Sequence, residues 1–139
     1  MKYINRSAEL LIKKAKDTFK TVLLTGARQT GKSTMLKEMY PEQRIISFDD
    51  PFLEEQAKND PEFFLSLYGS PITLDEIQYV PSLFGNIKKR VDESDKKGEY
   101  LLTGSQPFRL MEMYISLSFL LFPCERYKNV SLTLLLNQQ

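Results

Sequence analysis

The sequence of 139 residues contains no histidine and only one cysteine, Cys124. Without histidine, the chain cannot form a Ser-His-Asp or Cys-His catalytic set or a metal site with imidazole ligands. A single cysteine excludes an internal disulfide and a cysteine metal cluster, so nothing in the composition indicates secretion. The groups left for catalysis are carboxylates, amines, guanidinium groups, hydroxyls and backbone amides. Proteins use these groups to bind phosphates and to catalyse reactions of phosphates.

An excess of one charge and a long apolar run are also missing. Lys and Arg number 19 and Asp and Glu number 18, so charge gives no support for a nucleic-acid partner. The apolar stretch 117–122 is too short to span a bilayer, and the charged first twenty residues do not resemble a signal peptide. We therefore expect a cytoplasmic protein without a membrane partner, and its length fits one domain.

Segments typical of strands and helices alternate along the first 103 residues. Such alternation predicts an α/β fold in which helices cover both faces of a parallel sheet. A fifth strand over 130–136 is only weakly indicated. The expected strands are 21–25, 44–48, 72–74 and 99–103, and the expected helices are 7–17, 32–39, one or two between 51 and 68, and 83–91.

The strongest signal is the segment 26–33, GARQTGKS, which matches the phosphate-loop pattern G-x-x-x-x-G-K-[ST] between an expected strand and an expected helix. Its glycines let the backbone curl so that successive amides point at phosphate oxygens. The alternative is a glycine turn, but a chance match in a chain of this length has odds of roughly one in two hundred. The predicted nucleotide-binding residues are Gly26, Gln29, Thr30, Gly31, Lys32 and Ser33, with Lys32 on the terminal phosphates and Ser33 on Mg²⁺.

Two adjacent carboxylates, Asp75 and Glu76, follow the buried strand 72–74. A carboxylate at the carboxyl end of such a strand is suited to hold Mg²⁺, directly or through water, so we assign Asp75 to the metal. Glu76 is the candidate that orients and deprotonates an attacking water, which favours hydrolysis over phosphoryl transfer to a bound substrate. The alternative is that both residues cap the turn after the strand.

The strand 99–103 ends in a polar segment, Gly104-Ser105-Gln106. In P-loop proteins of the additional-strand type, a polar residue here senses the γ-phosphate, and we choose Ser105, with Gln106 second. The alternative is a glycine turn whose serine caps a helix from Pro107. Because the chain has no Asn-Lys-x-Asp motif, guanine specificity has no support and ATP is the expected nucleotide.

Three further features have simpler interpretations. The pair Asp49-Asp50 before Pro51 is expected to cap a helix. The run 88–90, Lys-Lys-Arg, is expected to form the solvated face of a helix, with an anionic partner as the alternative. Arg28 is given no catalytic role, since this position points away from phosphate in most loops of this type.

Four segments together resemble the AAA+ superfamily, and more narrowly its prokaryotic ATPases in which an AAA+ core precedes a C-terminal domain of unknown function. The segments are LLTGARQTGKST, SFDDP, ITLDEIQYVPSLFGNIKKRVD and YLLTGSQPFRLM, and the resemblance covers residues 4–113 with both Walker motifs. It implies a P-loop core with strand order 5-1-4-3-2, ATP and Mg²⁺ as ligands, and the roles given above to Lys32, Ser33, Asp75, Glu76 and Ser105. It also implies that Thr34 lies near the α-phosphate and that full-length relatives form homo-oligomers.

The last 29 residues depart from this pattern. From Met111 onward only four residues are charged, against 33 in the first 110. The family's Ser-Leu-Ala-Gly-Arg-like stretch is absent, and neither Arg109 nor Arg126 replaces its arginine. We therefore expect an ATP-binding core over 1–113 and an atypical apolar tail over 114–139, with a truncation or frameshift near Met113 as the hypothesis. Reading the encoding DNA beyond Met113 in the other two frames tests it.

Two functions follow from this sequence. The first is an ATPase that hydrolyses Mg-ATP in work on an unidentified protein partner. The second is a module that binds ATP with little or no hydrolysis. An arginine finger contributes about 10³ to 10⁵ in rate in P-loop hydrolases, and AAA+ enzymes receive theirs from a neighbouring subunit and add a helical lid. Since finger and lid are both missing here, we expect slow turnover by this chain alone.

Overall fold

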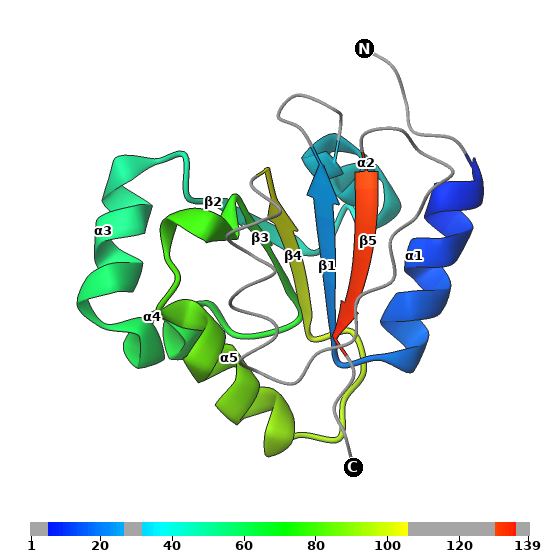
Figure 1. Cartoon of the computed structure of the whole chain (residues 1–139). Coiled ribbons are helices and arrows are strands. Elements are labelled where there is room, and N and C mark those ends of the chain that lie inside the picture. Colours follow the sequence, from blue (N-terminus) through cyan, green and yellow to red (C-terminus); the bar gives the residue numbers. More distant parts are fainter. Residues whose placement is uncertain (1–5, 27–31, 106–129, 136–139) are drawn as a thin grey trace.

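The computed structural model describes residues 6–26, 32–105 and 130–135 (Figure 1). The described strands and α-helices begin and end within one residue of the expected bounds, whereas the 3-10 turn over 77–79 was not expected. Two helices, rather than one, fill the segment 51–68. The helices are α1 (Arg6–Thr18), α2 (Lys32–Met39), α3 (Pro51–Asn59), α4 (Pro61–Tyr68) and α5 (Leu83–Asp92), with a 3-10 turn η1 (Ile77–Tyr79). The strands are β1 (Thr21–Gly26), β2 (Arg44–Ser47), β3 (Ile72–Asp75), β4 (Tyr100–Gly104) and β5 (Val130–Leu135).

The strands form one sheet in the order β2-β3-β4-β1-β5, which is the expected order 5-1-4-3-2 read from the opposite edge. Strands β1 to β4 are parallel, as predicted. Strand β5 runs antiparallel to β1, with Val130 opposite Gly26 and Leu135 opposite Thr21, so the expectation of a wholly parallel sheet is wrong at this edge. Strand β5 begins at the carboxyl edge of the sheet, where β1 and β4 end.

The side chains of β1 explain why this strand is apolar on both faces. Val22 and Leu24 pack in a cluster with buried residues of α1 and α2. Leu23, which points the opposite way, packs in the larger cluster with buried residues of α3, α4 and α5. The sheet is therefore the middle layer of three, and both of its faces are covered by helices, as in parallel sheets generally.

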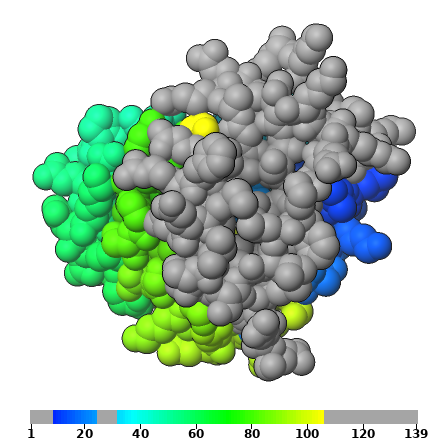
Figure 2. Space-filling view, in the orientation of Figure 1, coloured from blue at the N-terminus to red at the C-terminus, as the bar shows by residue number. Residues whose placement is uncertain are grey.

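The helices of the larger cluster and α1 lie on opposite flanks of the molecule. The ribbon shows α3, α4 and α5 on one side of the sheet and α1 on the other (Figure 1). In the space-filling view, the segment from β2 to α5 forms one flank and α1 the opposite flank (Figure 2). The carboxyl ends of β1, β3 and β4 meet at one edge between these layers, because the three strands are parallel neighbours.

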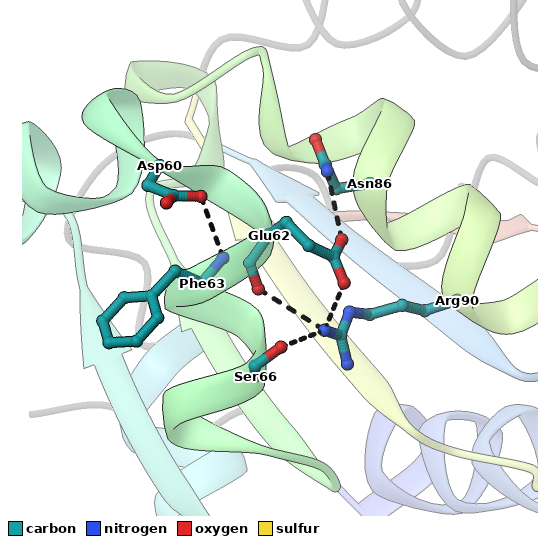
Figure 3. A network of polar contacts seen from close by, with 6 residues as sticks. All are labelled: Asp60, Glu62, Phe63, Ser66, Asn86 and Arg90. Carbon is teal, nitrogen blue, oxygen red and sulfur yellow. Dashed lines mark hydrogen bonds and ion pairs between the residues drawn. The ribbon is translucent and has the colours of Figure 1, made fainter.

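Polar side chains join α4 to α5 on the surface (Figure 3). Asp60 begins α4 by accepting a hydrogen bond from the Phe63 amide at 3.1 Å. From α5, Arg90 Nη2 contacts Glu62 Oε1 at 2.6 Å and donates to Ser66 Oγ at 2.5 Å. Asn86 Nδ2 donates to the other carboxylate oxygen of Glu62 at 3.2 Å. These hydrogen bonds from Asn86 and Arg90 hold the pKa of the Glu62 carboxyl below its ordinary value.

A membrane span is not found among the described helices, since none combines the required length with sufficient apolar character.

Candidate functional site

Several of the residues expected to bind nucleotide or metal lie at the carboxyl edge of the sheet. Gly26 is the last residue of β1, Lys32 begins α2, Asp75 ends β3 and Ser105 directly follows β4. Lys32 is buried, with 4% of its surface exposed, and Ser33 and Thr34 follow it in the first turn of α2. Gln29, Thr30, Gly31, Arg28 and the second-choice Gln106 lie outside the described residues.

The Asp75 carboxylate is held from both sides by neighbouring strands. Ser47 Oγ at the end of β2 donates to Oδ2 of Asp75 at 3.0 Å. Thr103 Oγ1 on β4 donates to Oδ1 at 2.5 Å. Both carboxylate oxygens therefore have a fixed direction while the side chain stays partly exposed. Such an arrangement can present a carboxylate to a cation from a defined position.

The Thr103 hydroxyl also anchors the residue after Asp75. It accepts a hydrogen bond from the backbone amide of Glu76 at 3.1 Å. Thr103 is fully buried, so this one hydroxyl serves as donor to the carboxylate and as acceptor for the amide without contact with solvent. The positions of Asp75 and Glu76 are therefore linked through a side chain of β4.

Glu76 has a left-handed backbone conformation, with φ 58° and ψ 49°. Within the described ranges it is the only residue other than glycine with a positive φ. This conformation costs a residue with a Cβ atom about 1–2 kcal/mol, and such residues gather at functional sites. Its effect here is to turn the chain from β3 into η1 while Glu76 remains 6% exposed.

The Glu76 carboxylate takes part in a closed triangle of hydrogen bonds. Gln78 Nε2 donates to Glu76 Oε2 at 2.8 Å and to Ser105 Oγ at 3.0 Å. Ser105 Oγ in turn donates to the same Oε2 of Glu76 at 2.9 Å. The structure thus brings Glu76 and Ser105, two of the predicted site residues, into direct contact.

Three residues of this edge were not singled out from the sequence, namely Ser47, Thr103 and Gln78. Each lies inside a segment that carries the family resemblance, but no local pattern indicates its role. Ser47 and Thr103 become visible only through the strand register, which sets Ser47 opposite Asp75 and places β4 beside β3. Gln78 could have been noticed as a polar residue between apolar neighbours in the segment after Glu76.

The simpler interpretations of the other polar features are largely confirmed. The Asp50 side chain caps α3 by accepting from the Phe52 amide at 2.9 Å. Lys88 pairs with Asp92 one turn further along α5 at 2.7 Å, and Lys89 is exposed, as expected of a solvated helix face. Arg90 departs from that expectation, because its guanidinium group packs against α4.

The described residues supply oxygen donors for a metal rather than a complete metal cage. Within 6–26, 32–105 and 130–135, no group of three or more His, Cys, Asp or Glu side chains is placed to hold a metal ion. At this edge Asp75 offers a carboxylate, and Ser33 in the first turn of α2 offers a hydroxyl. This set fits Mg²⁺, which keeps several waters and takes phosphate oxygens together with one or two carboxylates.

The fold and the strand order are those of a P-loop NTPase-like α/β protein. Residues 18–118 match the model of the family described as AAA domain, and the chain belongs to this family, which is a nucleotide-binding class. Two relatives, one from Mycobacterium bovis and one from Mycobacterium tuberculosis, are 32% identical to it over 101 residues, and both are named only as uncharacterized proteins. The match covers 72% of this chain and 23% of each relative, so the chain spans less than a quarter of their length. No solved structure matches the chain.

Proposed function

We propose that this AAA domain binds Mg-ATP at the carboxyl edge of its sheet and hydrolyses it. In this proposal the loop 26–33 and Thr34 bind the nucleotide, with Lys32 on the terminal phosphates and Thr34 near the α-phosphate. The observation that carries the proposal is the two-sided support of Asp75 by Ser47 and by Thr103, which lies on β4, the neighbour of the strand β1 that leads into this loop. A carboxylate fixed in this way is suited to a metal bound with phosphate.

Ser33 and Asp75 would hold Mg²⁺, Asp75 directly or through water. The metal would neutralise charge on the phosphate oxygens during hydrolysis. Both oxygens of Asp75 already accept a hydrogen bond, which still leaves each a second lone pair. The hydrogen bonds from Ser47 and Thr103 therefore leave Asp75 free to bind a metal, and they orient its carboxylate for that role.

Glu76 would act as the general base toward the attacking water, and Ser105 would contact the γ-phosphate. Their contact at 2.9 Å supports a shared role, because a base for water and a contact to the phosphate under attack must lie close together. The buried position of Glu76 supports this further, since a site with little water strengthens electrostatic interactions with charged groups.

The second candidate function is nucleotide binding with little or no hydrolysis. One observation favours it: Gln78 and Ser105 both direct a hydrogen at Oε2 of Glu76, one of the two carboxylate oxygens that could accept the proton of water. Unless one of these hydrogen bonds opens, that oxygen has little capacity left for the proton. Turnover measurements separate the two functions.

Calorimetric titration with Mg-ATP, combined with a turnover assay, tests the proposal. The variants are Lys32→Ala and Glu76→Gln, with Lys37→Ala as the matched control, since Lys37 is exposed in the last turn of the same helix. We expect Lys32→Ala to weaken binding by about 10- to 100-fold, the equivalent of a lost charged hydrogen bond. We expect Glu76→Gln to bind normally and to lose about 10²- to 10⁴-fold in turnover.

The outcomes distinguish the alternatives. Binding in the wild type and Glu76→Gln, with no turnover in either, favours the binding module. Absence of binding by folded wild-type protein contradicts the proposal as a whole. Equal loss of binding in Lys32→Ala and Lys37→Ala would mean that the phosphate loop is not the site.

Several finer properties belong to this proposal as well. They are membership of the branch with a C-terminal domain of unknown function, homo-oligomers in full-length relatives, a protein partner of unknown identity, and slow turnover by this chain alone. The division into a core over 1–113 and a tail over 114–139 also stays a prediction. Strand β5 lies within that tail and pairs with β1, which supports a role for part of the tail in the sheet.

A further inference from the structure

Gln78 is a buried polar residue in the turn that follows Glu76. It belongs to η1, and only 2% of its surface is exposed. The turn holds its backbone close to Glu76, because the Tyr79 amide donates to the Glu76 carbonyl at 3.2 Å and the Val80 amide donates to the Ile77 carbonyl at 3.0 Å. The side chain of Gln78 is therefore presented to the Glu76 carboxylate by a tight and locally hydrogen-bonded segment.

The hydrogens in the triangle can be assigned from its chemistry. An amide nitrogen carries two hydrogens, and Gln78 directs one to Glu76 Oε2 and one to Ser105 Oγ. The hydroxyl of Ser105 carries a single hydrogen, which goes to Oε2 of Glu76. The opposite orientation of the amide would set Oε1 of Gln78 against Oε2 of Glu76, two acceptors without a hydrogen between them. The orientation with Nε2 toward Glu76 is therefore the one in which each of the three contacts has a hydrogen.

A purely structural role does not account for this glutamine. Its Oε1 is buried and has no hydrogen-bond partner among the residues that the structure describes. A buried acceptor without a donor costs about 1–3 kcal/mol, so the amide oxygen gives no reason of its own for a glutamine at this position. The hydrogen bonds recorded for its side chain go to Glu76 and Ser105. What the glutamine provides is therefore the position of those two groups.

We propose that Gln78 is a positioning residue that holds the Glu76 carboxylate in place for its role as general base; this inference rests on the proposed function. If Ser105 donates its single hydrogen to the γ-phosphate, it can no longer donate to Glu76. Gln78 has two hydrogens, and among the residues that the structure describes it directs them to Glu76 and Ser105. Gln78 thus keeps the carboxylate fixed while Ser105 turns to the nucleotide.

Single-turnover hydrolysis, with protein in excess over radiolabelled ATP, measures this role even at slow rates. The test variant is Gln78→Met, which keeps the length of the side chain and removes both hydrogens. The matched control is Gln43→Met. Gln43 also makes two side-chain hydrogen bonds, accepting from Lys16 Nζ at 2.9 Å and donating to Thr73 Oγ1 at 3.1 Å, but it lies before β2 at the opposite edge of the sheet.

We expect Gln78→Met to lower the rate at saturating protein by about 10- to 100-fold, the effect of a misplaced catalytic group. The concentration that gives half the maximal rate should stay within about twofold of the wild type, because Gln78 is not among the residues proposed to bind nucleotide. Gln43→Met should lower the melting temperature about as much as Gln78→Met does, because each variant loses two side-chain hydrogen bonds. The rate of Gln43→Met should equal that of the wild type. This division between rate and affinity is one that a structural role would not produce.

Other outcomes overturn the inference. An unchanged rate in Gln78→Met overturns it alone and leaves the proposed function standing. Parallel loss of rate and affinity would show that Gln78 only supports the fold. Wild-type protein that binds ATP without any hydrolysis removes the hydrolytic half of the proposed function, and this inference falls with it.

If Gln78→Met does not fold, Gln78→Glu is the second variant. It keeps the shape of the side chain and sets an oxygen against Oε2 of Glu76, and the same loss of rate without loss of affinity is expected. Failure of both variants to fold makes Gln78 structural.

Discussion

Thr103 on β4 donates its buried hydroxyl hydrogen to Oδ1 of Asp75 at the end of β3. The same hydroxyl accepts the backbone N–H of Glu76, so one side chain sets the direction of a carboxylate and the path of the chain after it. The two acidic residues of the site are therefore coupled to the strand that separates them from the phosphate-loop strand. Substitutions in that strand should affect stability and chemistry together.

Thr103→Val tests this coupling. It should lower the free energy of unfolding by about 1–3 kcal/mol, because the buried amide of Glu76 loses its acceptor and Asp75 loses a donor. The control is Thr21→Val on the neighbouring strand β1. Thr21 is 1% exposed, and its hydroxyl has no hydrogen-bond partner among the described residues. Removing that hydroxyl should leave stability unchanged or raise it by up to about 1 kcal/mol. Urea denaturation measures both, and a similar loss in the two variants would contradict the role of Thr103.

Gly98→Ala should destabilise the protein through two effects. Gly98 has φ +65°, and a Cβ atom there would lie 2.4 Å from Cγ of Lys16 and 3.0 Å from its carbonyl oxygen. The left-handed backbone alone costs about 1–2 kcal/mol for alanine, and the crowding adds to it. Gly85→Ala is the control, because Gly85 lies within α5 and a Cβ atom there meets nothing within 4 Å. We expect this control to gain about 0.5–1 kcal/mol, so thermal unfolding should move in opposite directions for the two variants.

Acidification should weaken the contact between α4 and α5. The pKa of Glu62 lies below its ordinary value of 4.5 because Asn86 and Arg90 donate hydrogen bonds to its charged form. A carboxyl with a lowered pKa contributes stability above its unfolded-state value, and that contribution disappears as pH falls through the folded-state value. The difference in melting temperature between wild type and Glu62→Gln should therefore shrink between about pH 6 and about pH 3. The Glu62→Gln substitution can also be made in an Asn86→Ala background, where the first of these donors is gone. There the difference in melting temperature that Glu62→Gln causes should change less with pH. A constant difference across this range would show that the Glu62 charge contributes nothing.

Removal of Mg²⁺ tests the proposed role of Asp75. We expect chelation of Mg²⁺ with EDTA to weaken ATP binding by the wild type by about tenfold or more, a coupling of at least 1.4 kcal/mol. In Asp75→Asn this dependence should largely disappear, because the neutral amide is a poorer ligand for a hard cation. Asp92→Asn, at an exposed residue of α5 that pairs with Lys88, serves as the control and should keep the wild-type dependence. Equal Mg²⁺ dependence in all three proteins would exclude Asp75 as a metal ligand.

Much of the architecture was predictable from local patterns. The apolar residues of β1 and the helical spacing in α1 predicted those elements to within one residue. A strand buried on both faces is a continuous apolar run, and a helix buried along one face has apolar residues at helical spacing, so both are visible in the sequence. The cap at Asp50 was predicted for the same reason, because a capping side chain acts on an amide only two residues away. The direction of β5 was not predictable, since a single strand reads the same whether its neighbour runs parallel or antiparallel to it.

The sequence by itself determined which chemical groups the protein offers: a phosphate-loop motif, two adjacent carboxylates after a buried strand, and a serine after the next strand of the sheet. Only the tertiary structure decided that Thr103 reaches Asp75, and that Gln78 and Ser105 converge on one oxygen of Glu76. The contacts of Thr103 and Ser105 join residues 27 to 29 positions apart. Their partners are set by strand register and by the left-handed turn at Glu76, which depend on how distant segments pack and leave no local periodic signal.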